Sequence, residues 1–117
     1  MVVRLLAAMA LALLLALPAA ANEEHEQAVA RLSAELGELD ADPSLGRLAQ
    51  LERLQARQAV ADAREAKRRD REHKLALAGV RLETARLAAE SELLARQAAQ
   101  LDRERDQIMI EASRLEA

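Results

Sequence analysis

Apolar residues in the last third of the chain recur every seven positions without a gap. The members of this leucine stripe are Val80, Leu87, Leu94, Leu101, Ile108 and Leu115. Because seven residues make nearly two turns of an α-helix, the repeat places its members in one narrow line along a single helix. Such a line is typical of a helix covered by a second helix. We therefore expect a long helix over residues 72–117 that binds a helical partner, either another protein or a second copy of the chain.

A second apolar face lies on the first half of the same helix. It consists of Leu75, Ala78, Leu82, Ala85 and Ala89. Two faces imply two partners, and the stretch 43–68 has apolar and small residues at helical spacing that would fit the second face. The charged run 67–74 contains neither Gly nor Pro, which favours a continuous helix, but the second face needs a local partner. We therefore predict that residues 43–68 fold back along residues 72–95 as a hairpin.

A shorter helix over residues 23–39 is predicted before the hairpin. Its apolar positions share one side, and they are Val29, Leu32, Leu36 and Leu39. Asn22 is a good N-cap, and Pro43 cannot continue a helix, so Asp42 is expected to cap a second helix that starts at Pro43. The predicted fold class is all-α: a long helical hairpin with coiled-coil character and a short N-terminal helix, with helices at 23–39, 43–68 and 72–117.

Residues 1–21 resemble a cleavable signal peptide. Arg4 precedes an unbroken apolar run from Leu5 to Leu17, and Ala19 and Ala21 provide the small residues that a signal peptidase reads. A membrane anchor is the alternative, but a helix of this run would be only about 20 Å long, against a hydrocarbon core of about 30 Å. We expect secretion across the inner membrane, a periplasmic mature chain of residues 22–117, and no membrane contact after cleavage.

Composition narrows the classes of function. The chain of 117 residues is 51% hydrophobic, mainly Ala and Leu, and it has no aromatic residue, no Cys and a net charge of -3. This composition argues against an enclosed ligand pocket and against a nucleic-acid surface, which needs a basic face. His25 and His73 lie in different segments, and no nucleophile stands beside a base. No enzymatic activity, cofactor or metal is expected.

The residues beside the leucine stripe indicate a weak seam. The positions four residues after its members are Thr84, Ser91, Ala98, Arg105 and Ala112. Arg105 could specify how a partner helix aligns, or it could lie along the seam and pair with a neighbouring acidic residue. Gly79 is expected to permit close helix packing. Because Val80 and Leu87 could be shared with the hairpin, we expect the interface to run mainly from Leu94 to Leu115.

Several segments resemble a bacterial envelope family. They are Ala41-Asp42-Pro43-Ser44-Leu45, Arg69-Asp70-Arg71-Glu72-His73, Val80-Arg81-Leu82-Glu83-Thr84-Ala85 and the run from Leu101 to Arg114. The family is an uncharacterised helical domain often found beside OmpA-like peptidoglycan-binding domains. The resemblance implies an antiparallel helical region in the envelope with no known activity. The chain departs from the family's pattern at Gly79, where a charged residue is usual, and in ending at Ala117 without an OmpA-like domain, so direct peptidoglycan binding is not expected.

These features together predict a non-enzymatic structural or interaction protein of the periplasm that acts through coiled-coil contacts, with an envelope protein as a possible partner. One alternative is a periplasmic holdase chaperone that covers unfolded clients with its Ala- and Leu-lined helices. A second alternative is an amphipathic helix on the membrane surface, which the lack of aromatic anchors and the negative net charge disfavour.

Overall fold

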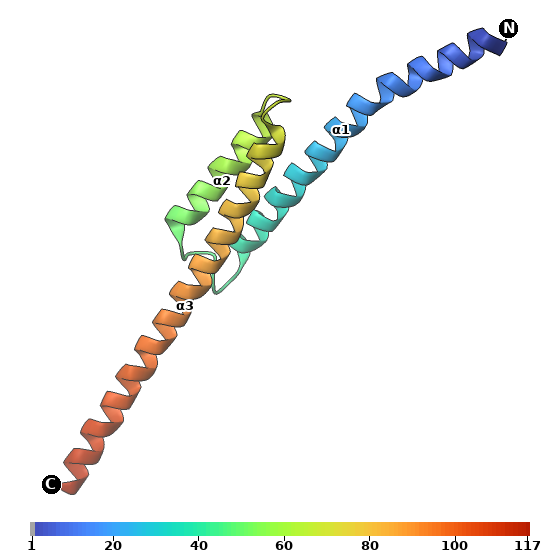
Figure 1. The fold of residues 1–117 in the computed structure, drawn as a ribbon. Helices are drawn as coiled ribbons and strands as arrows, with labels where there is room; N and C mark the ends of the chain where they lie inside the picture. Colours follow the sequence, from blue (N-terminus) through green and yellow to red (C-terminus); the bar gives the residue numbers. More distant parts are fainter. Residues whose placement is uncertain (1) are drawn as a thin grey trace.

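The computed structural model describes the backbone of residues 2–117 and the side chains of residues 20–117. The helices are α1 (Val2–Ala41), α2 (Gln50–Glu65) and α3 (Arg71–Glu116). α2 and α3 run antiparallel as a hairpin, the later part of α1 lies along it, and the second half of α3 extends away alone (Figure 1). The predicted all-α fold class, with an elongated helical hairpin, is confirmed.

The chain reverses direction between α2 and α3, as the second apolar face predicts. Ala66 leaves the helix in an extended conformation, and Asp70 donates its backbone N–H to the carbonyl of Lys67 at 2.8 Å. Arg71 reaches back to the carbonyl of Ala66 at 3.4 Å. Residues 67–69 of this turn are exposed and Asp70 is half-buried, so the reversal leaves its charged side chains in contact with water. The helices end at Glu65 and begin at Arg71, close to the predicted 68 and 72.

Small residues dominate the contact between α2 and α3, which is the largest interface between helices. The residues with 0% exposure are Ala56, Ala63, Ala78, Ala85 and Ala89. Because an Ala side chain ends at Cβ, the two backbones can approach closely, and the contact is made of many short-range dispersion interactions. The predicted hairpin face of α3 is therefore confirmed, with Leu82 as its large central member and Leu75 half-buried at one end.

α1 adds further large side chains to the core. Val29, Leu36 and Leu39 are buried against the hairpin, and Leu32 packs on both halves of the core. The predicted stripe of this helix is confirmed, but α1 does not begin at residue 23. Ala20, Ala21 and Asn22 are all within the helix, because nothing at these positions interrupts it. Asn22 is not an N-cap: its side-chain oxygen accepts a hydrogen bond from Arg71.

The predicted signal peptide, residues 1–21, falls almost wholly on the segment whose side chains lie outside the description. Of the two predicted cleavage-site residues, Ala19 is among them, whereas Ala21 is described and exposed. The prediction of cleavage is therefore not tested by the described residues.

The second helix starts later than predicted, at Gln50 and not at Pro43. The side chain of Asp42 does act as a cap, accepting hydrogen bonds from the backbone N–H groups of Ser44 and Leu45 at 2.8 and 2.9 Å. The segment that Asp42 caps is only a turn, however. It belongs to a crossing segment, residues 42–49, that connects the end of α1 to the start of α2. Leu48 is buried there, and Ala49 adopts a left-handed conformation with φ of 49° before α2 begins.

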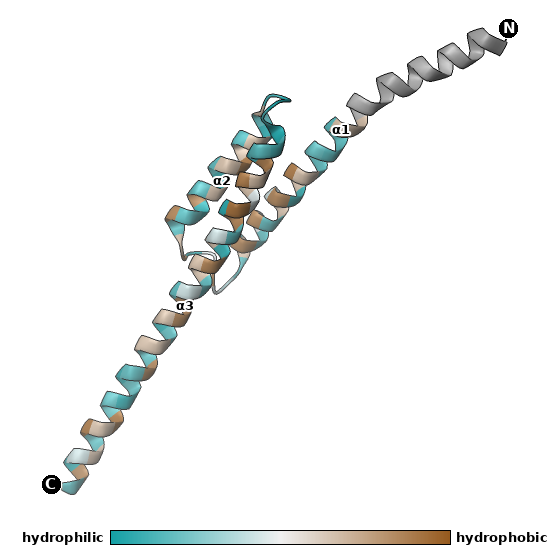
Figure 2. Cartoon of the chain, viewed as in Figure 1, coloured by the Kyte–Doolittle hydropathy of each residue, from teal (hydrophilic) through white to brown (hydrophobic). Residues whose placement is uncertain are grey.

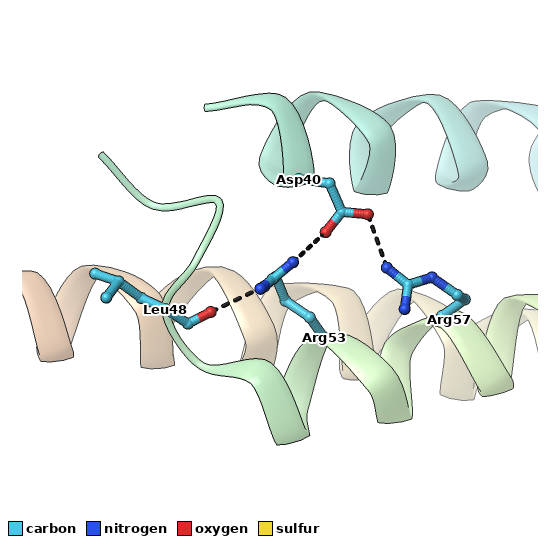
Figure 3. A network of polar contacts seen from close by, with 4 residues as sticks. All are labelled: Asp40, Leu48, Arg53 and Arg57. Atoms are coloured by element: carbon cyan, nitrogen blue, oxygen red, sulfur yellow. Dashed lines mark hydrogen bonds and ion pairs between the residues drawn. The ribbon is translucent and has the colours of Figure 1, made fainter. Parts of the chain in front are cut away.

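Two contacts from distant parts of the chain hold this crossing segment. Glu92 of α3 accepts the backbone N–H of Ala49 at 2.8 Å, and Asp40 at the end of α1 binds Arg53 and Arg57 of α2 at 2.6 and 2.9 Å (Figure 3). Arg53 also donates to the carbonyl of Leu48 at 2.8 Å. The left-handed residue and the late start of α2 therefore depend on groups far away in the sequence.

We predict opposite effects of alanine at two of the glycines. Gly79 lies inside α3, and a Cβ there would meet nothing within 4 Å, so the expectation that it permits close packing is wrong. Gly79→Ala should raise the free energy of unfolding by about 1 kcal/mol, because Gly costs a helix that much in entropy. Gly46→Ala should lower it, because the new Cβ would lie 2.4 Å from the carbonyl oxygen of Asp40.

Urea denaturation followed by circular dichroism measures both effects. Destabilisation by Gly79→Ala, or no loss of stability in Gly46→Ala, would contradict the packing described around these residues.

The Asp40 ion pairs predict a dependence of stability on pH. Partial burial alone would raise the pKa of Asp40, but the hydrogen bonds and charges of Arg53 and Arg57 outweigh burial and hold the pKa below its ordinary value. A carboxyl whose pKa is lowered by folding stabilises the fold above its unfolded pKa of about 3.9, and this contribution is lost as the pH falls through the folded pKa.

Asp40→Asn should therefore destabilise the protein at pH 7 and differ progressively less from the wild type as the pH falls below about 4. Urea midpoints measured across this range test the expectation. Asp106→Asn, on the exposed end of α3, serves as the control and should have little effect. An Asp40→Asn effect that is the same at acidic and neutral pH would exclude the ionised pair as its cause.

Candidate partner-helix interface

The second half of α3 has no covering helix. All residues from Leu94 to the end of the chain are exposed, and we call residues 94–116 the arm. At 1.5 Å per residue the arm is about 34 Å long. Figure 2 shows hydrophobic residues recurring along it between hydrophilic ones. A helix with this pattern normally buries its apolar positions, so the arm is a candidate binding surface.

The structure leaves every member of the leucine stripe exposed. The exposed fractions are 62% for Val80, 56% for Leu87, 64% for Leu94, 64% for Leu101, 65% for Ile108 and 88% for Leu115. The expectation that the hairpin shares Val80 and Leu87 is wrong. Val80 and the buried Leu82 are two residues apart, and two residues turn a helix by about 200°, so these side chains point to opposite sides of α3. The available stripe therefore runs from Val80 to Leu115.

The stripe is not parallel to the axis of α3. Seven residues rotate an α-helix by about 700°, which is about 20° short of two full turns. From Val80 to Leu115 the line therefore moves around the helix by about 100° in total. A partner can follow such a line only by winding around α3 in a left-handed sense, as the helices of a coiled coil do.

The seam beside the stripe is formed by small residues and one Arg. Thr84 donates its hydroxyl to the carbonyl of Val80 at 2.8 Å, so its polar atom is satisfied within α3. Arg105 is exposed, and the ion pairs of the described residues do not include it. The alternative in which Arg105 pairs with a neighbouring acidic residue is therefore not observed. Its guanidinium remains available to a partner.

A feature that the sequence interpretation missed lies on one flank of the stripe. Three residues after successive stripe members come Glu83, Glu90, Gln97, Glu104 and Glu111, which we call the acidic column. All five are exposed. Glu83 lies 3.4 Å from Arg86, whereas Glu104 and Glu111 accept hydrogen bonds from the uncharged Gln100 and Gln107. The same seven-residue spacing that reveals the stripe would have revealed this column.

The opposite flank has no consistent charge. One residue after successive members come Arg81, Ala88, Ala95, Asp102, Met109 and Glu116. Only the acidic column therefore presents one sign of charge along the seam.

The two histidines are not brought together. His25 of α1 lies with its Nε2 2.8 Å from the carbonyl oxygen of Ala63 and thereby ties α1 to the end of α2, whereas His73 is exposed in the first turn of α3. Among the residues that the structure describes, no group of three or more His, Cys, Asp or Glu is placed to hold a metal ion. Over the same residues, no helix has the length and apolar character needed to cross a membrane.

Comparison with protein families, characterised proteins and solved structures found no match to this chain. The likeness to the envelope family therefore stays a prediction, and the surface of α3 is the feature that bears on function.

Hydrogen exchange should distinguish the two halves of α3. Backbone amides of the arm are held only by contacts within one helix, and such helices are marginal in water. Amides of residues 78–89 lie against α1 and α2 and should open only with the whole fold. In a dilute solution of the chain without a partner, we expect amide exchange at residues 98–114 to be at least about a hundredfold faster than at residues 78–89. Mass spectrometry measures both rates. Equal protection in both halves would show that the arm is covered.

Proposed function

We propose that the chain is a non-enzymatic interaction protein of the bacterial cell envelope, in which the leucine stripe of α3 binds a helical partner. The observation that carries the proposal is the exposure of all six stripe members on one continuous helix. The predicted signal peptide supports the envelope location.

The energetic gain from covering the stripe is large enough to support binding. Full burial of a Leu, Ile or Val side chain contributes about 1.5–3 kcal/mol, and rather more than half of each stripe side chain is still accessible. The six together offer on the order of 5–10 kcal/mol before the costs of association and ordering are subtracted. A partner that covered only two or three members would gain too little to overcome those costs, so the proposed contact extends along most of the stripe.

The hairpin and the stripe have different roles in this proposal. α1 and α2 cover one side of α3 and fix its first half in place. The partner covers the opposite side, so α3 would lie between the body of the protein and the bound helix. The fold thus presents one preformed helix, about 52 Å long from residue 80 to residue 115, to its partner.

Crosslinking in bacterial envelope preparations that contain the chain tests the proposal. The wild type should give crosslinked adducts, with another protein or with itself, that are reduced at least about tenfold in the variant Leu94→Asp with Leu101→Asp, because two charges would enter the apolar seam.

The matched control is Leu51→Asp with Leu54→Asp. These leucines of α2 are 61% and 57% exposed but do not belong to the stripe. This control should keep the adducts of the wild type. Adducts that survive the two stripe substitutions, or that are lost equally in the control, would contradict the assignment of the interface to α3.

A further inference from the structure

From the charges that border the leucine stripe we infer that its partner is a helix of a different protein, with large apolar residues along its own seam and Lys or Arg along the flank that meets the acidic column. The inference rests on the proposed function and specifies the chemistry of the partner. Its basis is the juxtaposition of an uncovered apolar seam with a column of seven-residue spacing, in which four of the five positions are Glu and the middle one is Gln97.

A parallel pair of two copies of the chain places like charges together. In a parallel coiled coil, equivalent seam positions face each other, so Arg105 of one copy would meet Arg105 of the other. Each position of the acidic column meets the position five residues further along the second helix, so Glu111 would lie beside Glu116 of the other copy. Both contacts are repulsive, and the first lies within the seam, where water is partly excluded.

An antiparallel pair of copies would pack better along the seam than a parallel pair, but its electrostatic cost would be larger. It would set the leucines of one copy against the small residues of the other, which is a good match of size. It would also bring the two acidic columns to the same side of the seam, with Glu83 near Glu111 and Glu90 near Glu104 of the other copy. Because each such pair occurs twice, four contacts between Glu side chains would border one interface.

A basic flank on a different protein removes this cost in either orientation. Lys or Arg opposite the column would pair with Glu83, Glu90, Glu104 and Glu111, and large apolar residues could occupy the space above Ser91 and Ala98. Two of the four carboxylates, Glu104 and Glu111, accept hydrogen bonds from uncharged neighbours, and the ion pairs of the described residues include neither of them. The column therefore acts both against self-pairing and in favour of a basic partner.

Two helical probe peptides of five heptads test the inference with the full chain. Both carry Leu along the seam, and they differ only in having Lys or Glu at the flanking positions. The Lys probe should bind at least about tenfold more tightly than the Glu probe at low salt, and the difference should shrink as salt is raised. Sedimentation of the full chain alone, at the same concentrations, should show a monomer.

Glu104→Gln with Glu111→Gln should reduce the preference for the Lys probe several-fold. The matched control, Asp106→Asn with Glu72→Gln, removes the same charge away from the column and should keep the preference, since a general effect of net charge would appear equally in both variants.

The outcomes separate this inference from the proposed function. Stable self-association of the full chain that Leu94→Asp with Leu101→Asp abolishes would overturn the inference and support binding through the stripe. Equal affinity for both probes would also overturn the inference alone. A monomeric chain that binds neither probe would overturn both.

Discussion

The close approach of α2 to α3 is the constraint on which the rest of the structure depends. Five alanines with no exposed surface line this contact, and no larger side chain fits where they stand without separating the helices. Their small size has a cost, because an alanine buries little apolar area. The hairpin therefore needs α1, whose Val29, Leu36 and Leu39 add to the few large side chains of the hairpin and complete the core.

The same close contact explains how α3 can have two independent faces. Since α2 and α1 cover α3 from one side only, the buried residues occupy a narrow sector of the helix. The leucine stripe lies roughly opposite this sector, so it is not consumed by folding. Folding and the proposed binding thus use different residues of one helix, and a substitution in the stripe would weaken the proposed binding without opening the core.

Local patterns in the sequence predicted most of the fold. Spacings of three, four and seven residues identified both faces of α3, the stripe of α1 and the reversal near residue 67, because periodicity reports directly which side of a helix is buried. The crossing between α1 and α2 was not predicted. Its geometry depends on the close approach of Gly46 to the backbone of Asp40 and on the hydrogen bond between Ala49 and Glu92, 43 residues away, and neither contact produces a periodic pattern in the sequence. In the candidate interface, the leucine stripe was evident from the sequence. The exposure of Val80 and Leu87 beside the hairpin could be recognised only from the arrangement of the helices.

The length of the arm can change only in certain steps if the leucine stripe is to stay continuous. An insertion of seven residues lengthens α3 by about 10 Å and leaves the stripe nearly in line. An insertion of one, two, five or six residues instead rotates everything beyond it by about 100° or more around the helix axis, so Leu101, Ile108 and Leu115 would no longer follow Val80 and Leu87. The arm is in this sense a spacer with fixed increments, which would set how far from the body of the protein the end of the proposed partner helix is held.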